Sequence, residues 1–167
     1  MSEFASRVLA DYRPSEFSIE STNLTFELHE SQTTVTNVMS INRAASASAD
    51  QQVVATLHLD GEQLQLRAIL LNDKLLSASD YQVDQQSLRL ATELSSFTLT
   101  VVTVINPIDN SSLEGLFKSG GAFCTQCEAE GFRRITFFPE RPDVLARFTT
   151  TVRADKKRYP LLLSNGN

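Results

Sequence analysis

Two cysteines and two histidines are the side chains of this sequence best suited to metal binding or redox chemistry. Cys124 and Cys127 have the C-x-x-C spacing, but a structural zinc ion would need a second pair of ligands, which the sequence lacks. A thioredoxin-like pair would need a lowered thiol pKa, and the acidic residues that follow Cys127 oppose the thiolate. We therefore predict two small core or loop residues, and a redox role remains the alternative.

The histidines do not form a metal site either. His29 and His58 each lie beside leucines of an alternating run, so both side chains should point away from the core. The sequence has no H-E-x-x-H helix, no G-x-S-x-G elbow and no glycine loop followed by Lys-Ser/Thr. Taken alone, the residues predict no metal ligand and no catalytic residue in this chain.

Residues 113–143 are dense in polar groups without an obvious structural purpose. Gln126, Glu128 and Glu130 lie between apolar neighbours, and glycines occur nearby at positions 115, 120, 121 and 131. Glycine permits tight backbone turns, and loops on a rigid sheet often carry binding groups. The segment is therefore a candidate binding loop, and a polar loop with solvated carboxylates is the alternative.

The elements that must position this loop alternate with a period of two. Apolar residues alternate with polar ones in residues 24–28, 57–59, 64–68, 88–90, 97–105, 135–137 and 148–154. Such runs, separated by turns and without a helix-length stretch, predict an all-β fold, an antiparallel β-sandwich or saddle. At most one short helix is expected, near 142–147, where Pro142 suits a first helical position.

The breaks between these runs carry turn residues. Asp60-Gly61 predicts a hairpin, Asn72-Asp73 a second turn, and Asn106-Pro107 the end of a strand. Residues 43–52 are low in complexity and predict a loop, and residues 159–167 predict a strand that runs into a turn. We find no internal boundary, so residues 1–167 are expected to form a single β-domain whose chain continues or was cut.

Composition excludes several function classes. The net charge is −5, and the one basic cluster, residues 153–158, lacks interleaved aromatic residues, so no nucleic-acid face is expected. No apolar run approaches the roughly 18 residues of a membrane span. The N-terminus has an acid at Glu3 and no apolar segment, unlike a secretory signal. With only two cysteines, reduced thiols and a cytoplasmic location are predicted.

Several long motifs, in order, resemble the bacterial aminopeptidase N family, which are zinc metallo-aminopeptidases of the gluzincin type. The segments that carry the resemblance are residues 11–14, 24–28, 113–120, 124–133, 141–150, 154–156, 159–160 and 162–167, whereas residues 43–95 match only loosely. The resemblance implies the β-rich N-terminal saddle of an enzyme that removes N-terminal amino acids from peptides. It also implies that the chain stops before the zinc catalytic domain, so this fragment alone should be inactive.

The resemblance assigns two substrate-binding residues. In the family's glutamine-x-glutamate motif the glutamate binds the free α-amino group of the substrate, and the glutamine lines the first subsite. These positions are Gln126 and Glu128 here. The implied partners are peptides with a free N-terminus and the chain's own downstream catalytic domain, with zinc bound outside the fragment. Neither nucleic acid nor a membrane is an expected partner.

Some charges near the motif receive no role from the resemblance. We predict that Glu130, Arg133, Arg134 and Glu140 form interdomain salt bridges or are solvated, and that the thiol of Cys127 faces the opposite side of the loop. The alternative function is a stand-alone β-sandwich module that binds protein or carbohydrate, although the sequence has no tryptophan for a sugar platform. The isolated fragment is expected to expose an apolar patch and to self-associate.

Overall fold

The predicted all-β fold is confirmed. The computed structural model describes residues 8–44 and 54–165, and within these ranges regular structure consists of strands and two single-turn 3-10 helices. The elements are η1 (Leu9–Asp11), β1 (Phe17–Glu27), β2 (Thr33–Arg43), β3 (Ala55–Asp60), β4 (Gln65–Leu71), β5 (Lys74–Leu75), β6 (Gln82–Val83), β7 (Ser87–Thr92), β8 (Ser96–Ile105), β9 (Gly115–Ser119), β10 (Ala122–Gln126), η2 (Phe132–Arg134) and β11 (Arg147–Arg153). No helix in the described ranges has the length and apolarity needed to cross a bilayer.

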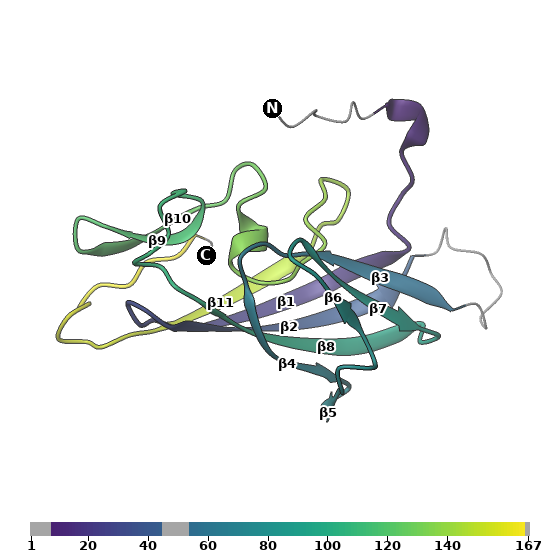
Figure 1. The fold of residues 1–167 in the computed structure, drawn as a ribbon, viewed down its shortest axis with the longest axis horizontal. Helices are drawn as coiled ribbons and strands as arrows, with labels where there is room; N and C mark the ends of the chain where they lie inside the picture. The colour runs from purple at the N-terminus through teal and green to yellow at the C-terminus, as the bar shows by residue number, and fades with distance from the viewer. Residues whose placement is uncertain (1–7, 45–53, 166–167) are drawn as a thin grey trace.

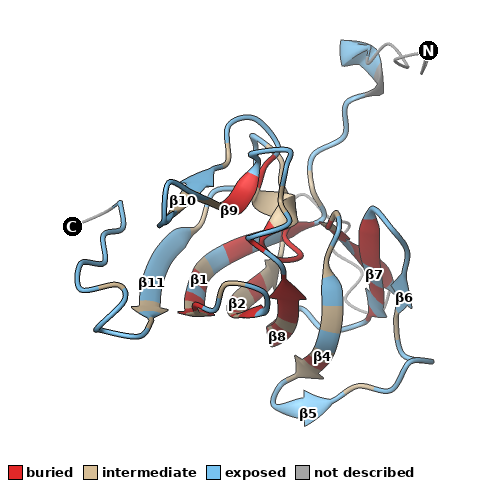
Figure 2. Ribbon diagram, turned by 60° about the vertical axis from the view of Figure 1, so that its left-hand side comes forward, coloured by how far each residue is buried: buried red, intermediate tan, exposed pale blue. Residues whose placement is uncertain are grey.

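The strands form one large sheet and two small ones. The six-stranded sheet has the order β11-β1-β2-β8-β4-β5, the three-stranded sheet the order β3-β7-β6, and β9 and β10 form a hairpin. The two small sheets lie toward opposite ends of the large one (Figure 1). Among the described strands only β11 pairs in parallel, with β1, and it is exposed along most of its length (Figure 2).

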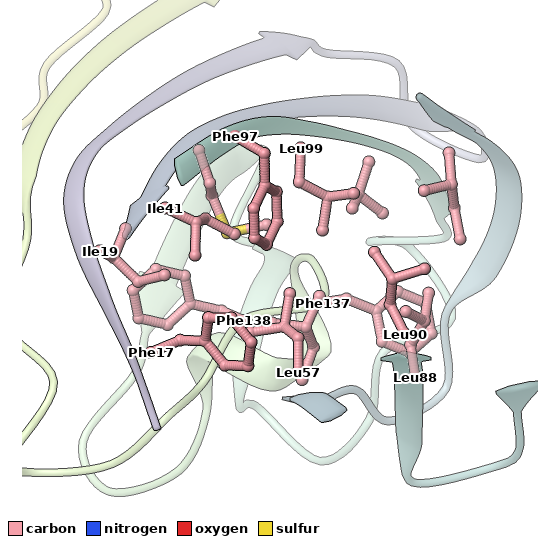
Figure 3. Close-up of a cluster of buried hydrophobic side chains, with 14 of the residues drawn as sticks. Phe17, Ile19, Ile41, Leu57, Leu88, Leu90, Phe97, Leu99, Phe137 and Phe138 are labelled. Carbon is pink, nitrogen blue, oxygen red and sulfur yellow. The ribbon is translucent and has the colours of Figure 1, made fainter. Parts of the chain in front are cut away.

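Alternation along the strands produces the core. In β1, β2 and β8 buried side chains, most of them apolar, occupy roughly every second position, so one face of the large sheet is buried. A first cluster fills the space between the large sheet and β3–β7; it includes Met39, Leu57, Leu99 and Phe137, each at most 2% exposed (Figure 3). A second cluster, which includes Leu116 of β9, joins the β9–β10 hairpin to the same face.

Residues 135–138 connect the two clusters without joining the large sheet as a strand. Ile135 belongs to the second cluster and Phe137 to the first. A buried backbone needs hydrogen-bond partners, and here polar side chains of the large sheet supply them. Asn37 Nδ2 donates to the Phe137 carbonyl at 3.3 Å, and Thr103 Oγ1 donates to the Ile135 carbonyl at 3.1 Å. The turn η2, directly before this segment, is thereby anchored to the core.

The prediction of a hairpin at Asp60-Gly61 is wrong. β3 ends at Asp60 but pairs with β7, whereas β4 pairs with β8 in the large sheet. The chain leaves one sheet for the other because Asp60 forms a bridge with Phe138 and the Gly61 N–H donates to the Gln86 carbonyl at 3.0 Å. Long-range contacts therefore determine the path of the chain at a dipeptide that is typical of hairpin turns.

Other local predictions have mixed outcomes. Asn72 and Asp73 do form a turn between β4 and β5, with φ of 47° and 64°, and β8 ends directly before Asn106. Residues 142–147 do not form a helix: residues 142–143 are a turn in which Asp143 is held by Tyr12 and Arg141, and β11 begins at Arg147. Residues 159–165 contain no strand. Of the predicted loop 43–52, residue 43 ends β2 and residues 45–52 lie outside the described residues.

Candidate functional site

The two predicted substrate-binding residues lie together on an exposed loop. Gln126 is the last residue of β10, and Glu128 follows two residues later; both are exposed. The Gln126 side-chain amide Nε2 donates to the Glu128 carbonyl oxygen at 2.9 Å, so one member of the pair orders the backbone of the other. The peptide bond between Glu128 and Ala129 is cis. The carboxylate of Glu128 is thus presented to solvent from an ordered backbone.

The loop closes tightly on itself. The Gly131 N–H donates to the Cys127 carbonyl at 2.9 Å and completes a turn around Glu128. Gly131 has no room for a side chain, since a Cβ there would lie 2.5 Å from the Gln126 carbonyl oxygen and 2.9 Å from Cys127 Cα. Glycine at this position lets the two ends of the loop approach closely.

Cys127 lies on the inner side of the loop, as predicted. Its side chain packs against the second core cluster, whereas Gln126 and Glu128 are exposed. Burial, together with the negative charge of Glu140, raises the pKa of the Cys127 thiol. Neither Cys127 nor Cys124 is in a disulfide. A raised pKa lowers the thiolate fraction at neutral pH, so the environment of Cys127 favours packing over redox chemistry.

Glu140 and Arg133 form an internal ion pair, which corrects the prediction of interdomain or solvated charges. Arg133 Nε lies 2.7 Å from Glu140 Oε2, and both side chains are less than one-fifth exposed. The same carboxylate accepts the backbone N–H groups of Phe132 at 2.9 Å and Arg133 at 3.2 Å. Glu130 joins the pair from the loop, 3.5 Å from Arg133 Nη2. Nothing local in the sequence marked Glu140, because its partners lie seven and eight residues earlier.

Arg134 is a second internal anchor that the sequence did not reveal. Its guanidinium contacts Glu62 at 2.7 Å and Glu114 at 3.1 Å, and it is 14% exposed. It also donates to the Gln63 side chain at 2.8 Å. These contacts tie η2 to the β3–β4 connection and to the segment before β9, so Arg134 stabilises the base of the loop.

The β9–β10 hairpin, which carries Gln126, is fixed at its other end through Glu30. Lys118 of β9, Arg158 and Tyr159 all donate to Oε1 of Glu30, which follows β1. Hydrogen bonds from Lys118 and Tyr159 lower the pKa of the Glu30 carboxyl, and Glu30 raises the pKa of Lys118. The Phe123 ring of β10 packs on Tyr159 with centroids 5.0 Å apart. These contacts hold the hairpin to the residues that follow β1 and β11.

The described part of the chain does not fit a zinc ion. No group of three or more His, Cys, Asp or Glu side chains that could hold a metal occurs in residues 8–44 and 54–165. His29 and His58 are exposed, as predicted, and His58 Nε2 lies 3.5 Å from Asp60 Oδ1. The donor set around them lacks the ligands that a zinc site needs.

Two hollows on the described surface lie away from the candidate loop. The two hollows, of about 540 and 350 Å³, lie between the β3–β4 connection and the β6–β7 region and are lined by residues such as Glu62, Asp84 and Gln86. Neither hollow includes Gln126 or Glu128. An open carboxylate can contact a cationic group, but ligand pockets normally bury most of the ligand surface, so further walls would be required.

Comparison with known proteins shows what the whole domain is similar to. A family model described as the Peptidase M1 N-terminal domain matches residues 15–167. The chain is 47% identical over 159 residues to aminopeptidase N of Caulobacter vibrioides, covering 95% of this chain and 18% of that protein. It is 45% identical over 157 residues to aminopeptidase N of Escherichia coli, covering 94% of this chain and 17% of that one. The chain therefore spans less than one-fifth of the length of these relatives.

Solved structures share the fold. Aminopeptidase A of Legionella pneumophila, in complex with aspartic acid, has a TM-score of 0.86 at 28% identity over 96% of this chain and 18% of that chain. An M1 zinc metallopeptidase of Deinococcus radiodurans has a TM-score of 0.65 at 13% identity over 82% of this chain and 32% of that chain, a likeness of fold alone. These similarities give no support to the alternative of a stand-alone binding module.

Proposed function

Because this chain belongs to the family of Peptidase M1 N-terminal domains, we propose that it is the N-terminal domain of a zinc-dependent aminopeptidase. The whole protein would remove N-terminal amino acids from peptides, with residues 1–167 forming one β-domain ahead of the zinc catalytic domain. The chain alone would be inactive. The observation that carries the proposal is the exposed Glu128 carboxylate, held on an ordered loop beside Gln126.

The chemistry of Glu128 suits recognition of a peptide N-terminus. A free α-amino group has a pKa of about 7.7–8.0, so it is largely an ammonium ion at neutral pH. A carboxylate binds such a group through charge-assisted hydrogen bonds, whereas an internal peptide nitrogen carries no charge. A carboxylate next to the first peptide bond would therefore favour removal of terminal residues over internal cleavage.

Gln126 would have two roles at this site. As a side chain exposed at the end of β10, it would line the first subsite. Through its hydrogen bond to the Glu128 carbonyl, it would also restrain the backbone that presents the carboxylate. Both residues stand at one end of a hairpin anchored at Glu30, so the subsite is built on ordered strands.

The remaining components of the active site lie outside this chain in the proposal. Zinc, the cofactor of the family, would be bound by the catalytic domain, and Glu128 would contact the substrate amine without being a metal ligand. The catalytic domain would close the open side of the loop and cover the exposed side chain of Phe148 (50% exposed) beside it. Phe148 packs on Phe132, which follows the loop, with ring centroids 5.8 Å apart.

The cellular setting is also proposed. We propose the cytoplasm as the location, since both cysteines are free thiols, and we expect peptides with a free N-terminus as partners rather than nucleic acid or membranes. Fractionation of the source cells, with activity assayed in each fraction, would test the location.

The substitution Glu128→Ala in the full-length enzyme tests the proposed function. Removal of one carboxylate–ammonium contact should lower kcat/KM for aminoacyl p-nitroanilides by about 2–4 kcal/mol of transition-state stabilisation, or tens- to hundreds-fold. The matched control is Glu130→Ala, which removes another carboxylate of the same loop and should retain most of the activity. Near-normal activity of Glu128→Ala, with an unchanged Tm, would contradict the proposal.

A further inference from the structure

The loop that carries Glu128 is held at two ends by different parts of the fold. At its start, Gln126 pairs with Gly115 in the β9–β10 hairpin. At its end, the backbone N–H groups of Phe132 and Arg133 both point at the carboxylate of Glu140, at 2.9 and 3.2 Å. The guanidinium Nε of Arg133 reaches the same carboxylate at 2.7 Å. One side chain therefore receives three hydrogen bonds from the turn at which the loop ends.

Glu140 is itself fixed from the core side. Its backbone N–H donates to Asp60 Oδ2 at 3.0 Å, and Asp60 is bridged to Phe138. Glu140 is largely buried, and its charge reaches Cys127 on the inner side of the loop, where it contributes to the raised pKa of that thiol. The Glu140 carboxylate is therefore shielded from solvent beside the end of the loop, whereas Glu128 is exposed.

The neighbouring aromatic rings also pack against the Phe132–Arg133 turn, but they do not fix the direction of its backbone N–H groups. Phe132 packs edge-on against Phe138 and Phe148, with centroids 5.1 and 5.8 Å apart. Ring packing of this kind tolerates small rotations, whereas three hydrogen bonds to one carboxylate define the orientation of two successive peptide groups. Loss of the carboxylate would leave two partly buried N–H donors without their acceptor, and the turn would shift as these groups find new partners.

We propose that Glu140 is a positioning residue for substrate binding: it fixes the Phe132–Arg133 turn and so sets where the Glu128 carboxylate meets the substrate amine. The inference rests on the proposed function of Glu128. Glu140 contacts no substrate in this role. A site held on supporting hydrogen bonds loses affinity when those supports are removed, because small displacements weaken a directional contact.

The test uses the full-length enzyme and aminoacyl p-nitroanilides. Glu140→Ala should raise KM on the order of tenfold, with a smaller change in kcat, because the amine contact is misplaced while the catalytic domain is intact. Glu140→Gln keeps an acceptor oxygen for the backbone N–H groups and should recover a large part of the affinity. Glu62→Ala is the matched control, since it removes a carboxylate that supports the same turn through Arg134 and accepts no hydrogen bond from the N–H groups of Phe132 and Arg133.

A double-mutant cycle distinguishes positioning from stability alone. If Glu140 acts through Glu128, the rise in KM caused by Glu140→Ala should disappear in the Glu128→Ala background. A wild-type KM for Glu140→Ala, a KM rise of equal size in Glu62→Ala, or full additivity in the cycle would overturn the inference while leaving the function of Glu128 in place. If Glu128→Ala has near-normal activity, that result would instead contradict the proposed function of Glu128 itself. If Glu140→Ala does not fold, Glu140→Gln takes its place in the cycle.

Discussion

Gly61 lies against the ring of Phe137 with no space between them: a Cβ on Gly61 would fall 2.2 Å from two of the ring carbons. This contact lies where the chain passes from the three-stranded sheet into the large sheet, and the buried ring belongs to the segment that follows η2. The segment that follows η2 therefore packs directly against the connection between β3 and β4, where the chain passes from one sheet to the other.

We expect Gly61→Ala to destabilise the domain by about 1–3 kcal/mol, because the added methyl group forces Phe137 or the backbone to move. Urea denaturation of the 167-residue chain measures the change. Gly120→Ala is the control, since a Cβ there meets nothing within 4 Å and only the strain of φ +55° remains. Its cost should stay near 1 kcal/mol. Equal losses in the two variants would argue against overpacking at Gly61.

Arg134→Ala should also destabilise the domain, because it removes a mostly buried guanidinium from Glu62 and Glu114. Since both carboxylates are partly hydrated, the loss should be about 2 kcal/mol, between the values typical of exposed and buried pairs. Arg147→Ala provides the comparison: its pair with Glu20 is 80% and 58% exposed, and its loss should be too small to measure by denaturation. A negligible effect of Arg134→Ala would contradict the assignment of an internal anchor.

The stability of the domain should depend on pH through Glu30. Hydrogen bonds from Lys118 and Tyr159 lower the folded-state pKa of Glu30 below the usual 4.5. The contribution of the ionised Glu30 carboxylate to the stability of the folded domain is therefore fully present above pH 4.5. It is lost as the pH falls through the lowered pKa. Glu30→Gln should flatten the decline of Tm between about pH 5 and 3, whereas Glu20→Gln should leave that decline unchanged. An identical acid profile for the wild type and Glu30→Gln would contradict this role.

The thiol of Cys127 should react slowly with alkylating reagents. Its raised pKa, caused by burial and then by Glu140, reduces the thiolate at pH 7, and the reaction should accelerate as the pH rises above 9. Labelling with iodoacetamide, followed by mass spectrometry of the Cys124→Ser and Cys127→Ser variants, separates the two positions. Rapid labelling of Cys127 at pH 7 would revive the redox alternative.

The native form of the protein offers a direct check of the domain assignment. An antibody against this chain should detect, in the source cells, a species several times heavier that copurifies with zinc and aminopeptidase activity. This result is expected because the chain covers only 17–18% of its relatives. A native species of the size of this chain, without zinc and inactive, would contradict the proposal and return Glu128 to the status of a loop carboxylate.

Much of the architecture could be predicted without coordinates. The period-two pattern identified β1, β3, β7 and β8 and their buried faces, because successive side chains of a strand point to opposite sides whatever the partner strand is. It did not predict β2, β9 or β10, the run 135–137 is not a strand, and β11 is exposed on both faces along most of its length. The Asn72-Asp73 turn was found for a similar reason, since its residues favour positive φ on their own. The family resemblance, carried by motifs in residues 113–167, is confirmed. The roles of Gln126 and Glu128 remain predictions.

Strand partners and the supports of the loop were decided only by the tertiary structure. Asp60-Gly61 has the composition of a hairpin, yet contacts with Gln86 and Phe138 send the two flanking strands into different sheets. Glu140 resembles any surface acid in the sequence until the fold brings it to the N–H groups of Phe132 and Arg133. Local propensity depends on neighbouring residues, whereas pairing and burial depend on residues distant in the chain, so only the first kind of information can be read from sequence patterns.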